Sequence, residues 1–146
     1  MIDITLAEQL KKDGYVLTMS VGASMKPMLT QRREQLVIEK LETAPKNNDV
    51  VLFQRQSGKY VLHRVVRTKK DHYLIRGDNC CDNEKVYPQQ IIGILKGFYR
   101  GERYISCRES RKHRCYIAIW RLLYPVRWGY CKGKVCAYRL ISRLRR

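Results

Sequence analysis

The sequence predicts a mainly β domain, with antiparallel strands in a barrel-type arrangement, a short helix before them and a helical extension after them. Three observations lead to this prediction. Short apolar segments alternate with turn residues from residue 36 to residue 106, an amphipathic pattern precedes them, and the composition changes after residue 108. Short strands at such close spacing are typical of antiparallel, barrel-like domains.

The expected elements follow the apolar pattern along the chain. Residues 3–13 have apolar positions at helical spacing and end in Lys-Lys-Asp before Gly14, which predicts a short amphipathic helix. Residues 15–17 form a brief apolar segment. An apolar run from Cys115 to Tyr124 ends at Pro125, and residues 135–146 are apolar at helical spacing, so two helices joined by residues 128–130 are expected at the end. Strands are expected over residues 36–39, 50–53, 60–66, 72–75, 91–99 and 104–106.

The chain of 146 residues has the length of one domain with a small appendage. Its 45% hydrophobic and 29% charged residues exclude a disordered chain, a collagen-like repeat and a coiled coil. Its charge is unusual, because 30 basic and 13 acidic residues give a net charge of +17. Residues 110–146 hold 11 of the basic residues and no acidic residue. We therefore divide the chain into a domain at residues 1–109 and a basic, aromatic-rich helical extension at residues 110–146.

The sequence carries no pattern of a targeting segment. No apolar stretch reaches the ~20 residues that a membrane-spanning helix needs. The first residues include Asp3 and Glu8 and no long apolar run, unlike a secretory signal. We therefore expect a cytoplasmic protein that is peripheral on the inner face of the membrane if its extension binds lipid.

The six cysteines are expected to be reduced and mostly buried, because a domain of this size needs no disulfides.

Three polar residues suggest nucleophilic catalysis. Ser24 lies in a small-residue segment, His63 follows within a strongly apolar strand, and Asp78 comes directly after Gly77. A serine hydroxyl is a weak nucleophile unless a base removes its proton. Histidine suits this role because its ordinary pKa of ~6.5 is close to neutral pH, and a carboxylate can hold it in one tautomer.

The segments Ser24-Met25-Lys26-Pro27, His63-Arg64-Val65-Val66 and Gly77-Asp78-Asn79 resemble, in order and spacing, the motifs of the type I signal peptidase superfamily, which includes self-cleaving phage and SOS repressors. The resemblance covers about residues 20–100. It is closest to the archaeal and endoplasmic-reticulum branch, in which a histidine replaces the lysine base. The resemblance implies the superfamily's β-fold, a Ser24 nucleophile and a His63 base, with no metal or cofactor. Arg64 cannot be the base, because a guanidinium stays protonated.

Two features depart from the family's pattern. Gly22 stands where the family has a serine that helps to bind the oxyanion, so the oxyanion is expected to rely on the backbone N–H of Ser24, alone or with another backbone donor. The acid is open among Asp78, Asp82 and Glu84, and Asp78 has an alternative role as a turn residue that hydrogen-bonds to the backbone. Neither the membrane anchor of the signal peptidases nor the DNA-binding domain of the repressors is expected, which suggests a small stand-alone peptidase.

The preferred hypothesis is a serine endopeptidase that cleaves a leader or precursor peptide on the cytosolic side. The alternative is a catalytically inactive module of the same fold that binds a partner through its basic extension. In residues 110–146, aromatic rings alternate with Arg and Lys, which is typical of interfacial membrane segments and of single-strand nucleic-acid binders. We favour an anionic membrane surface, or docking onto an acidic partner or onto the chain's own domain, over nucleic acid, and the sequence leaves the oligomeric state open. His72 and His113 are expected to be ordinary polar residues.

Overall fold

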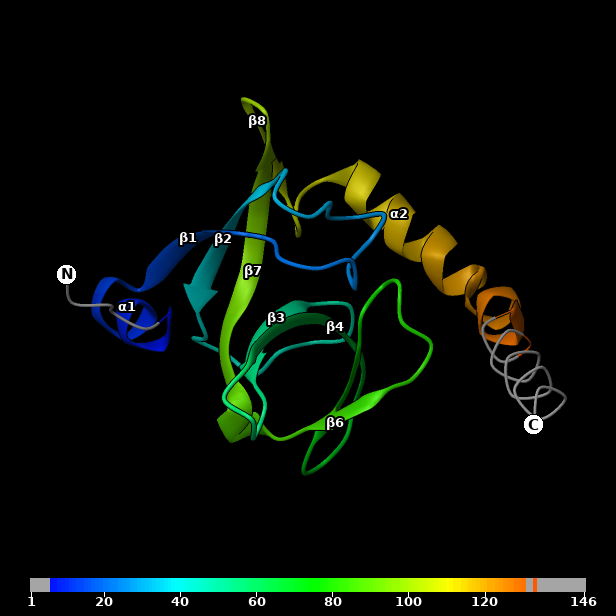
Figure 1. The fold of residues 1–146 in the computed structure, drawn as a ribbon, viewed down its shortest axis with the longest axis horizontal. Coiled ribbons are helices and arrows are strands. Elements are labelled where there is room, and N and C mark those ends of the chain that lie inside the picture. The colour runs from blue at the N-terminus through cyan, green and yellow to red at the C-terminus, as the bar shows by residue number, and fades with distance from the viewer. Residues whose placement is uncertain (1–5, 131–132, 134–146) are drawn as a thin grey trace, which may run out of the picture.

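The computed structural model describes residues 6–130 and residue 133. It confirms a mainly β domain with an antiparallel sheet, a short helix before the sheet and helical structure after it (Figure 1). The helices are α1 (Leu6–Asp13) and α2 (Arg111–Leu122), with a 3-10 turn, η1, at Pro88–Gln90. The strands are β1 (Tyr15–Met19), β2 (Gln35–Lys40), β3 (Val50–Gln54), β4 (Tyr60–Thr68), β5 (Tyr73–Arg76), β6 (Glu84–Val86), β7 (Ile91–Arg100) and β8 (Arg103–Ser106).

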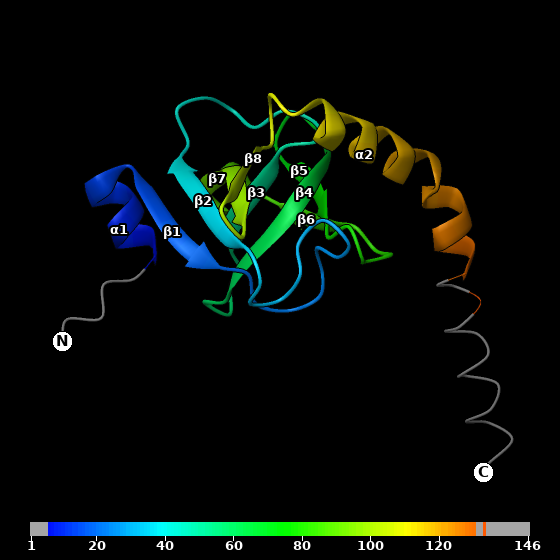
Figure 2. The same cartoon turned by 90° about the horizontal axis from the view of Figure 1, so that it is seen from above.

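The strands pair in the order β1-β2-β7-β3-β4-β5-β6, and β8 pairs with β7. β7 is the centre of the sheet, because it pairs with β2, β3 and β8. The sheet curls around the core in Figure 2, but within the described part of the chain β1 and β6 do not pair with each other. The barrel is therefore not closed. β6 was not expected from the sequence, since it has three residues and its central residue, Lys85, is exposed.

Two groups of buried side chains form the core. The first lies between α1, β1, β2 and β7 and includes Leu10 and Phe98. The second lies over β3, β4 and β5 and includes Ile75. Successive residues of a strand point to opposite faces, so the buried strand β3 contributes Leu52 to the first group and Val51 to the second. β3 thereby joins the two halves of the core.

The segment between β1 and β2 has no regular helix or strand, yet several contacts hold it in place. Met25 and Met28 are buried in the first core group. Glu34 is also buried, and its carboxylate accepts hydrogen bonds from the Thr30 N–H (2.7 Å) and from the Arg100 guanidinium on β7 (3.1 Å). Arg100 donates a further bond to the Met28 carbonyl (2.9 Å). The segment that carries the predicted nucleophile is thus fixed to the sheet.

The extension begins with α2, whose first turn is capped by Ser110. The Ser110 side chain accepts a hydrogen bond from the His113 N–H (3.2 Å), which satisfies one of the unpaired donors at the start of a helix. Among the described residues, no helix is long and apolar enough to cross a membrane.

The expected junction between two helices at residues 128–130 is wrong. After a turn at Leu123, the chain is helical over residues 124–130. Pro125 does not end the helix, because it falls in the first turn of this second segment, where a missing N–H is tolerated. The second helix expected at residues 135–146 lies outside the described residues.

The described cysteines differ from the expected buried thiols. Cys80 and Cys107 are half-buried, Cys115 is exposed, and all three are free. Cys81 is in a disulfide bond, so the expectation of reduced thiols is wrong at this position. A core large enough to fold without disulfides does not prevent one from forming. The remaining two cysteines lie outside the described residues.

We predict that Glu34→Ala lowers the free energy of unfolding by about 1–3 kcal/mol, because the Thr30 N–H loses its buried acceptor. Urea denaturation followed by circular dichroism measures this change. The matched control is Glu39→Ala, which removes an exposed ion pair with Lys96 (3.1 Å). Its effect should stay below about 0.5 kcal/mol. Equal losses in the two variants would contradict the role assigned to Glu34.

Candidate functional site

A cleft of about 460 Å³ opens between the segment that follows β1 and the β3–β4 hairpin. Polar residues from distant parts of the chain line it: Ser24, Arg55, His63, Cys80 and Glu84. Most of the other lining residues are apolar. A largely apolar cleft with a few convergent polar groups is the usual form of a binding or active site.

His63 lies in β4, opposite Val51 of β3, and is only 4% exposed. The Oε1 atom of Glu84 lies 2.9 Å from its Nδ1 atom. This oxygen is poorly aligned with the ring N–H, and no described residue makes a well-aligned hydrogen bond to Nδ1. The contact is therefore a close electrostatic one. The second oxygen of Glu84, Oε2, accepts a hydrogen bond from Nε of Arg55 (2.9 Å) and forms an ion pair with its Nη2 atom (2.6 Å).

Burial lowers the pKa of His63 below its ordinary value of 6.5. The negative charge of Glu84 opposes this shift, and the positive charge of Arg55 adds to it. At neutral pH the imidazole is therefore neutral. A neutral imidazole can accept a proton, which is the form that a general base requires.

The turn after β5 fastens the Ser24 segment beside His63. The Asn79 N–H donates to the Ser24 carbonyl (2.7 Å), and the Asn79 side-chain amide donates to the Ala23 carbonyl (3.2 Å). Gly77 makes the close approach possible, because a Cβ atom at this position would lie 2.6 Å from Ser24 O and 3.0 Å from His63 Nε2. Nε2 of His63 thus lies near the backbone of Ser24.

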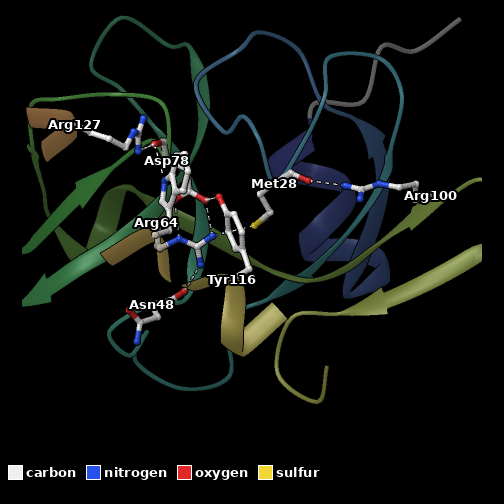
Figure 3. A network of polar contacts seen from close by, with 8 residues as sticks. Met28, Asn48, Arg64, Asp78, Arg100, Tyr116 and Arg127 are labelled. Atoms are coloured by element: carbon white, nitrogen blue, oxygen red, sulfur yellow. Dashed lines mark hydrogen bonds and ion pairs between the residues drawn. The ribbon is translucent and has the colours of Figure 1, made fainter. Parts of the chain in front are cut away.

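Asp78 is the centre of a buried polar network (Figure 3). Its carboxylate accepts two hydrogen bonds from Arg64, at 2.8 and 2.7 Å, and a third from the Tyr116 hydroxyl at 2.9 Å. Its backbone carbonyl accepts hydrogen bonds from Trp120 Nε1 (2.9 Å) and from Arg127 (2.6 Å). The helical extension therefore holds the turn that fastens the Ser24 segment.

Arg64 connects this network to two further segments. Its guanidinium donates to the Asn48 carbonyl (2.9 Å) and lies 2.9 Å from the sulfur of Met28. Burial alone would lower the pKa of Arg64, but the hydrogen bonds and charge of Asp78 outweigh it and raise this pKa. Arg64 stays charged, so it holds the turn, the Met28 segment and the β2–β3 loop together.

The three candidate acids occupy different positions. Glu84, the first residue of β6, is the one whose carboxylate contacts His63. Asp78 is bound within the polar network, and Asp82 is exposed in the loop between β5 and β6. The structure thus brings Ser24, His63 and Glu84 into one cleft. The catalytic roles of all five candidate residues stay predictions.

Ser24 is half-buried in the wall of the cleft, two residues after Gly22, whose φ is 95°. Within the described part of the chain, no hydrogen bond joins the Ser24 hydroxyl to His63. No described acceptor takes the Ser24 backbone N–H either. This N–H is therefore available to bind the oxyanion of a reaction intermediate, a role in which Gly22 cannot help because it has no hydroxyl group.

Two residues of the cleft have no recognisable signal in the sequence. Arg55 lies in the β3–β4 turn, and its contact with Glu84 depends on strands that are distant in the chain. Cys80 places its sulfur 2.8 Å from the position that a Gly77 Cβ would occupy. Burial raises the pKa of Cys80, and the charge of Glu84 adds to the shift. The thiol is therefore protonated at neutral pH.

The other two histidines lie outside the cleft. His72 is half-buried beside Asp71, with 2.6 Å between its Nδ1 and the carboxylate. His113 differs from the expected ordinary polar residue, because it is buried in α2 and stacks on Tyr116. Burial lowers the pKa of His113 to about 4, so this ring is neutral at neutral pH.

A comparison of the sequence with models of known protein families finds no match, and no curated protein matches it. The resemblance to signal peptidases therefore depends on the three motifs alone. The geometry adds that the residues of these motifs contact one another in the fold.

We predict that Gly77→Ala lowers the free energy of unfolding by about 1–3 kcal/mol, because the new methyl group pushes against Ser24 O and His63. It should also shift the imidazole NMR signals of His63. The control is Gly129→Ala, at a helical position with open space around it. Alanine is the better residue in a helix, so this variant should lose no stability. Unchanged His63 signals in Gly77→Ala would contradict the proximity described here.

Proposed function

We propose that the chain is a serine endopeptidase of the signal-peptidase type that cleaves a leader or precursor peptide. The observation that carries the proposal is the shared cleft, in which the Ser24 segment lies near Nε2 of His63 and the Glu84 carboxylate lies at Nδ1. The lowered pKa of His63 supports a role as base. The resemblance of the three motifs to signal peptidases supports the substrate class.

In the proposed reaction, Nε2 of His63 takes the proton of the Ser24 hydroxyl while the oxygen attacks the carbonyl carbon of the scissile peptide bond. The protonated His63 then gives this proton to the leaving amine, and a peptidyl ester remains on Ser24. His63 then takes a proton from a water molecule, whose oxygen attacks the ester, and gives this proton to the Ser24 oxygen as the ester bond breaks and the new carboxyl end is released. Glu84 stabilises the imidazolium that forms in each half of the reaction, and Arg55 holds Glu84 in place.

The developing oxyanion would be bound by the backbone N–H of Ser24. Gly22 offers no hydroxyl, so one hydrogen-bond donor is missing relative to the family's pattern. The absence of one such donor typically reduces the rate by about 10²–10³-fold. We therefore expect slow turnover, in keeping with an enzyme that acts once on each precursor.

The substrate peptide is proposed to bind in extended form along β1. β1 is the last strand in the sheet order, and its outer edge is unpaired within the described part of the chain. It leads directly into the Ser24 segment, and its residues Tyr15, Leu17 and Met19 are exposed. An extended peptide can add to such an edge through main-chain hydrogen bonds, while alternate side chains enter pockets.

Binding without cleavage is the second candidate function. Two observations favour it: no hydrogen bond joins the Ser24 hydroxyl to His63, and Glu84 is poorly aligned with Nδ1. Hydrogen bonds between catalytic residues are often long in the absence of substrate and tighten when it binds. The activity measurements below separate the two candidates.

We predict that the full chain cleaves members of a proteome-derived peptide library, with new termini detected by mass spectrometry. Ser24→Ala and His63→Ala should each reduce the rate by at least about 10³-fold, because the two residues act as a unit. For the same reason, the double variant should be no slower than either single variant.

Two control variants make this test specific. Ser57→Ala changes an exposed serine in the β3–β4 turn and should leave the rate unchanged. Cys80→Ser tests the thiol, a second nucleophilic side chain that lines the cleft. If Cys80→Ser abolished cleavage while Ser24→Ala retained it, the nucleophile would be the thiol. Peptide binding with no cleavage by any form of the protein would favour the inactive binding module.

The pH dependence of kcat/KM tests whether Glu84 is the acid that acts on His63. We predict that the rate falls on acidification with a midpoint below pH 6.5, because protonated His63 cannot act as a base. Glu84→Gln removes a charge that raises the pKa of His63, so the midpoint should move to lower pH and the rate should fall. Arg55→Gln removes a charge that lowers this pKa, so the midpoint should move to higher pH.

The other candidate acids provide the controls for this profile. Asp82→Asn should change neither the midpoint nor the rate. Asp78→Asn breaks a buried ion pair with Arg64, so it should lower the free energy of unfolding by about 3–5 kcal/mol. Equal, mild effects of the amide at Asp78, Asp82 and Glu84 would mean that no acid orients His63.

A further inference from the structure

One side of the helical extension is occupied by contacts within the molecule. Tyr116, Trp120 and Arg127 hydrogen-bond to Asp78, as described above. Tyr124 donates to the Cys81 carbonyl at 3.0 Å. The polar atoms on this side of the extension are therefore engaged within the molecule, where a cleft of about 320 Å³ lies beside Trp120, Tyr124 and Arg127.

Another side carries exposed aliphatic residues. Ile119 is 57% exposed, Leu122 is 79% exposed and Val126 is 72% exposed. Ile119 and Leu122 are three residues apart in α2 and so lie on one side of it, and Val126 lies in the helical segment that follows. Leu123, at the turn between the two helical segments, is also exposed. Figure 1 shows this part of the chain, yellow to orange, extending beyond the sheet.

The charges near this aliphatic side are all positive. Arg111, Arg114 and Arg121 are exposed. Residues 110–130 contain five Lys and Arg and no Asp or Glu, and the same bias continues to residue 146. An aliphatic strip flanked by cations is complementary to a surface that has an apolar interior and an anionic exterior.

The same observations disfavour two other ligands. Single-stranded nucleic acid binds by stacking bases on exposed rings, but here Tyr116 and Trp120 stack on each other, and the guanidinium of Arg127 lies 3.9 Å from the Trp120 ring centre. Arg76 covers the ring of Tyr124 in the same way, at 3.4 Å. The exposed rings, Trp128 and Tyr130, follow the aliphatic residues in the chain, and aromatic residues beside an aliphatic strip are also typical of membrane-surface helices. A second copy of this surface would bring like charges together.

We propose that the side of the extension that bears Ile119, Leu122 and Val126 binds the surface of an anionic lipid bilayer. The helix would lie in the plane of the interface, with the aliphatic residues below the headgroups and the arginines among the lipid phosphates. The contacts with Asp78 stay intact in this arrangement. The proposal does not depend on the peptidase activity.

The test uses the full chain and two kinds of vesicle, one of phosphatidylcholine and one with 30% phosphatidylglycerol. The protein should sediment with the anionic vesicles and not with the neutral ones. Binding should weaken at least tenfold between 0.1 and 0.5 M NaCl, because salt screens the attraction between exposed charges. Equal binding to both vesicles would overturn the proposal.

Two variants locate the binding surface. Leu122→Ser combined with Val126→Ser should weaken binding to anionic vesicles at least tenfold, and both side chains are exposed, so the fold should persist. Leu17→Ser, which changes an exposed leucine on β1, is the matched control and should bind as the unchanged protein does. A loss in Leu17→Ser as large as that in the double variant would overturn the assignment of the surface.

The charge contribution is tested in the same way. Arg111→Gln, Arg114→Gln and Arg121→Gln together should weaken binding at least tenfold. The control removes three exposed charges elsewhere, at Arg33, Lys69 and Lys70, and should have a smaller effect. Equal effects of the two triple variants would overturn a specific role for the extension.

Two further measurements address the other ligands. Tighter binding to a single-stranded RNA oligonucleotide than to anionic vesicles, unaffected by Leu122→Ser, would overturn the proposal in favour of nucleic acid. A dimer in sedimentation velocity that Leu122→Ser abolishes would overturn it in favour of a second copy. A monomer that binds anionic vesicles and not RNA would support it.

Discussion

The buried ion pair between Arg64 and Asp78 is the interaction on which the candidate site depends. Neighbouring residues of a strand point to opposite faces, so His63 lines the cleft while Arg64 lies on the other side, against the helical extension. Once Arg64 holds Asp78, the preceding Gly77 lies against His63 and the backbone of Ser24. A buried ion pair adds little net stability, but the loss of one partner leaves an uncompensated charge. The pair therefore selects one arrangement of strand, turn and helix.

Local patterns predicted most of the strands, because alternation and turn residues act within a few positions of each other. Predictions failed where the outcome depends on distant partners. β6 has only three residues, and it forms because β5 offers an edge to pair with. Closure of the sheet depends on whether its first and last strands meet, which no local pattern determines. Pro125 was expected to end a helix, but its effect depends on its position within a turn, which the apolar pattern alone does not fix.

The motifs placed the serine and the histidine in one cleft, but they could not identify the acid. Asp78 is the acid of the Gly-Asp-Asn turn, but its carboxylate is bound by Arg64, whose planar, permanently charged group holds a carboxylate through two parallel hydrogen bonds. Glu84 reaches His63 through the register of two strand pairs. Ile75 of β5 lies opposite Glu84 of β6 on one side and opposite Val65 of β4, two residues after His63, on the other. Such a register is a property of the folded sheet, so sequence spacing left the choice open.

The extension shows why composition alone does not assign a role to a basic, aromatic segment. Aromatic residues with polar atoms can be buried where those atoms find acceptors, and Asp78 provides acceptors for both Tyr116 and Trp120. These two rings are thereby held against the domain, and the residues that stay exposed are aliphatic and cationic, together with the rings of Trp128 and Tyr130. An external surface bound by these residues leaves the contacts with Asp78 undisturbed. The extension can therefore bind a surface on its outer side while its inner side keeps the Gly77-Asp78-Asn79 turn in place beside His63. The two functions proposed for this chain, peptide cleavage and membrane-surface binding, thus use different residues.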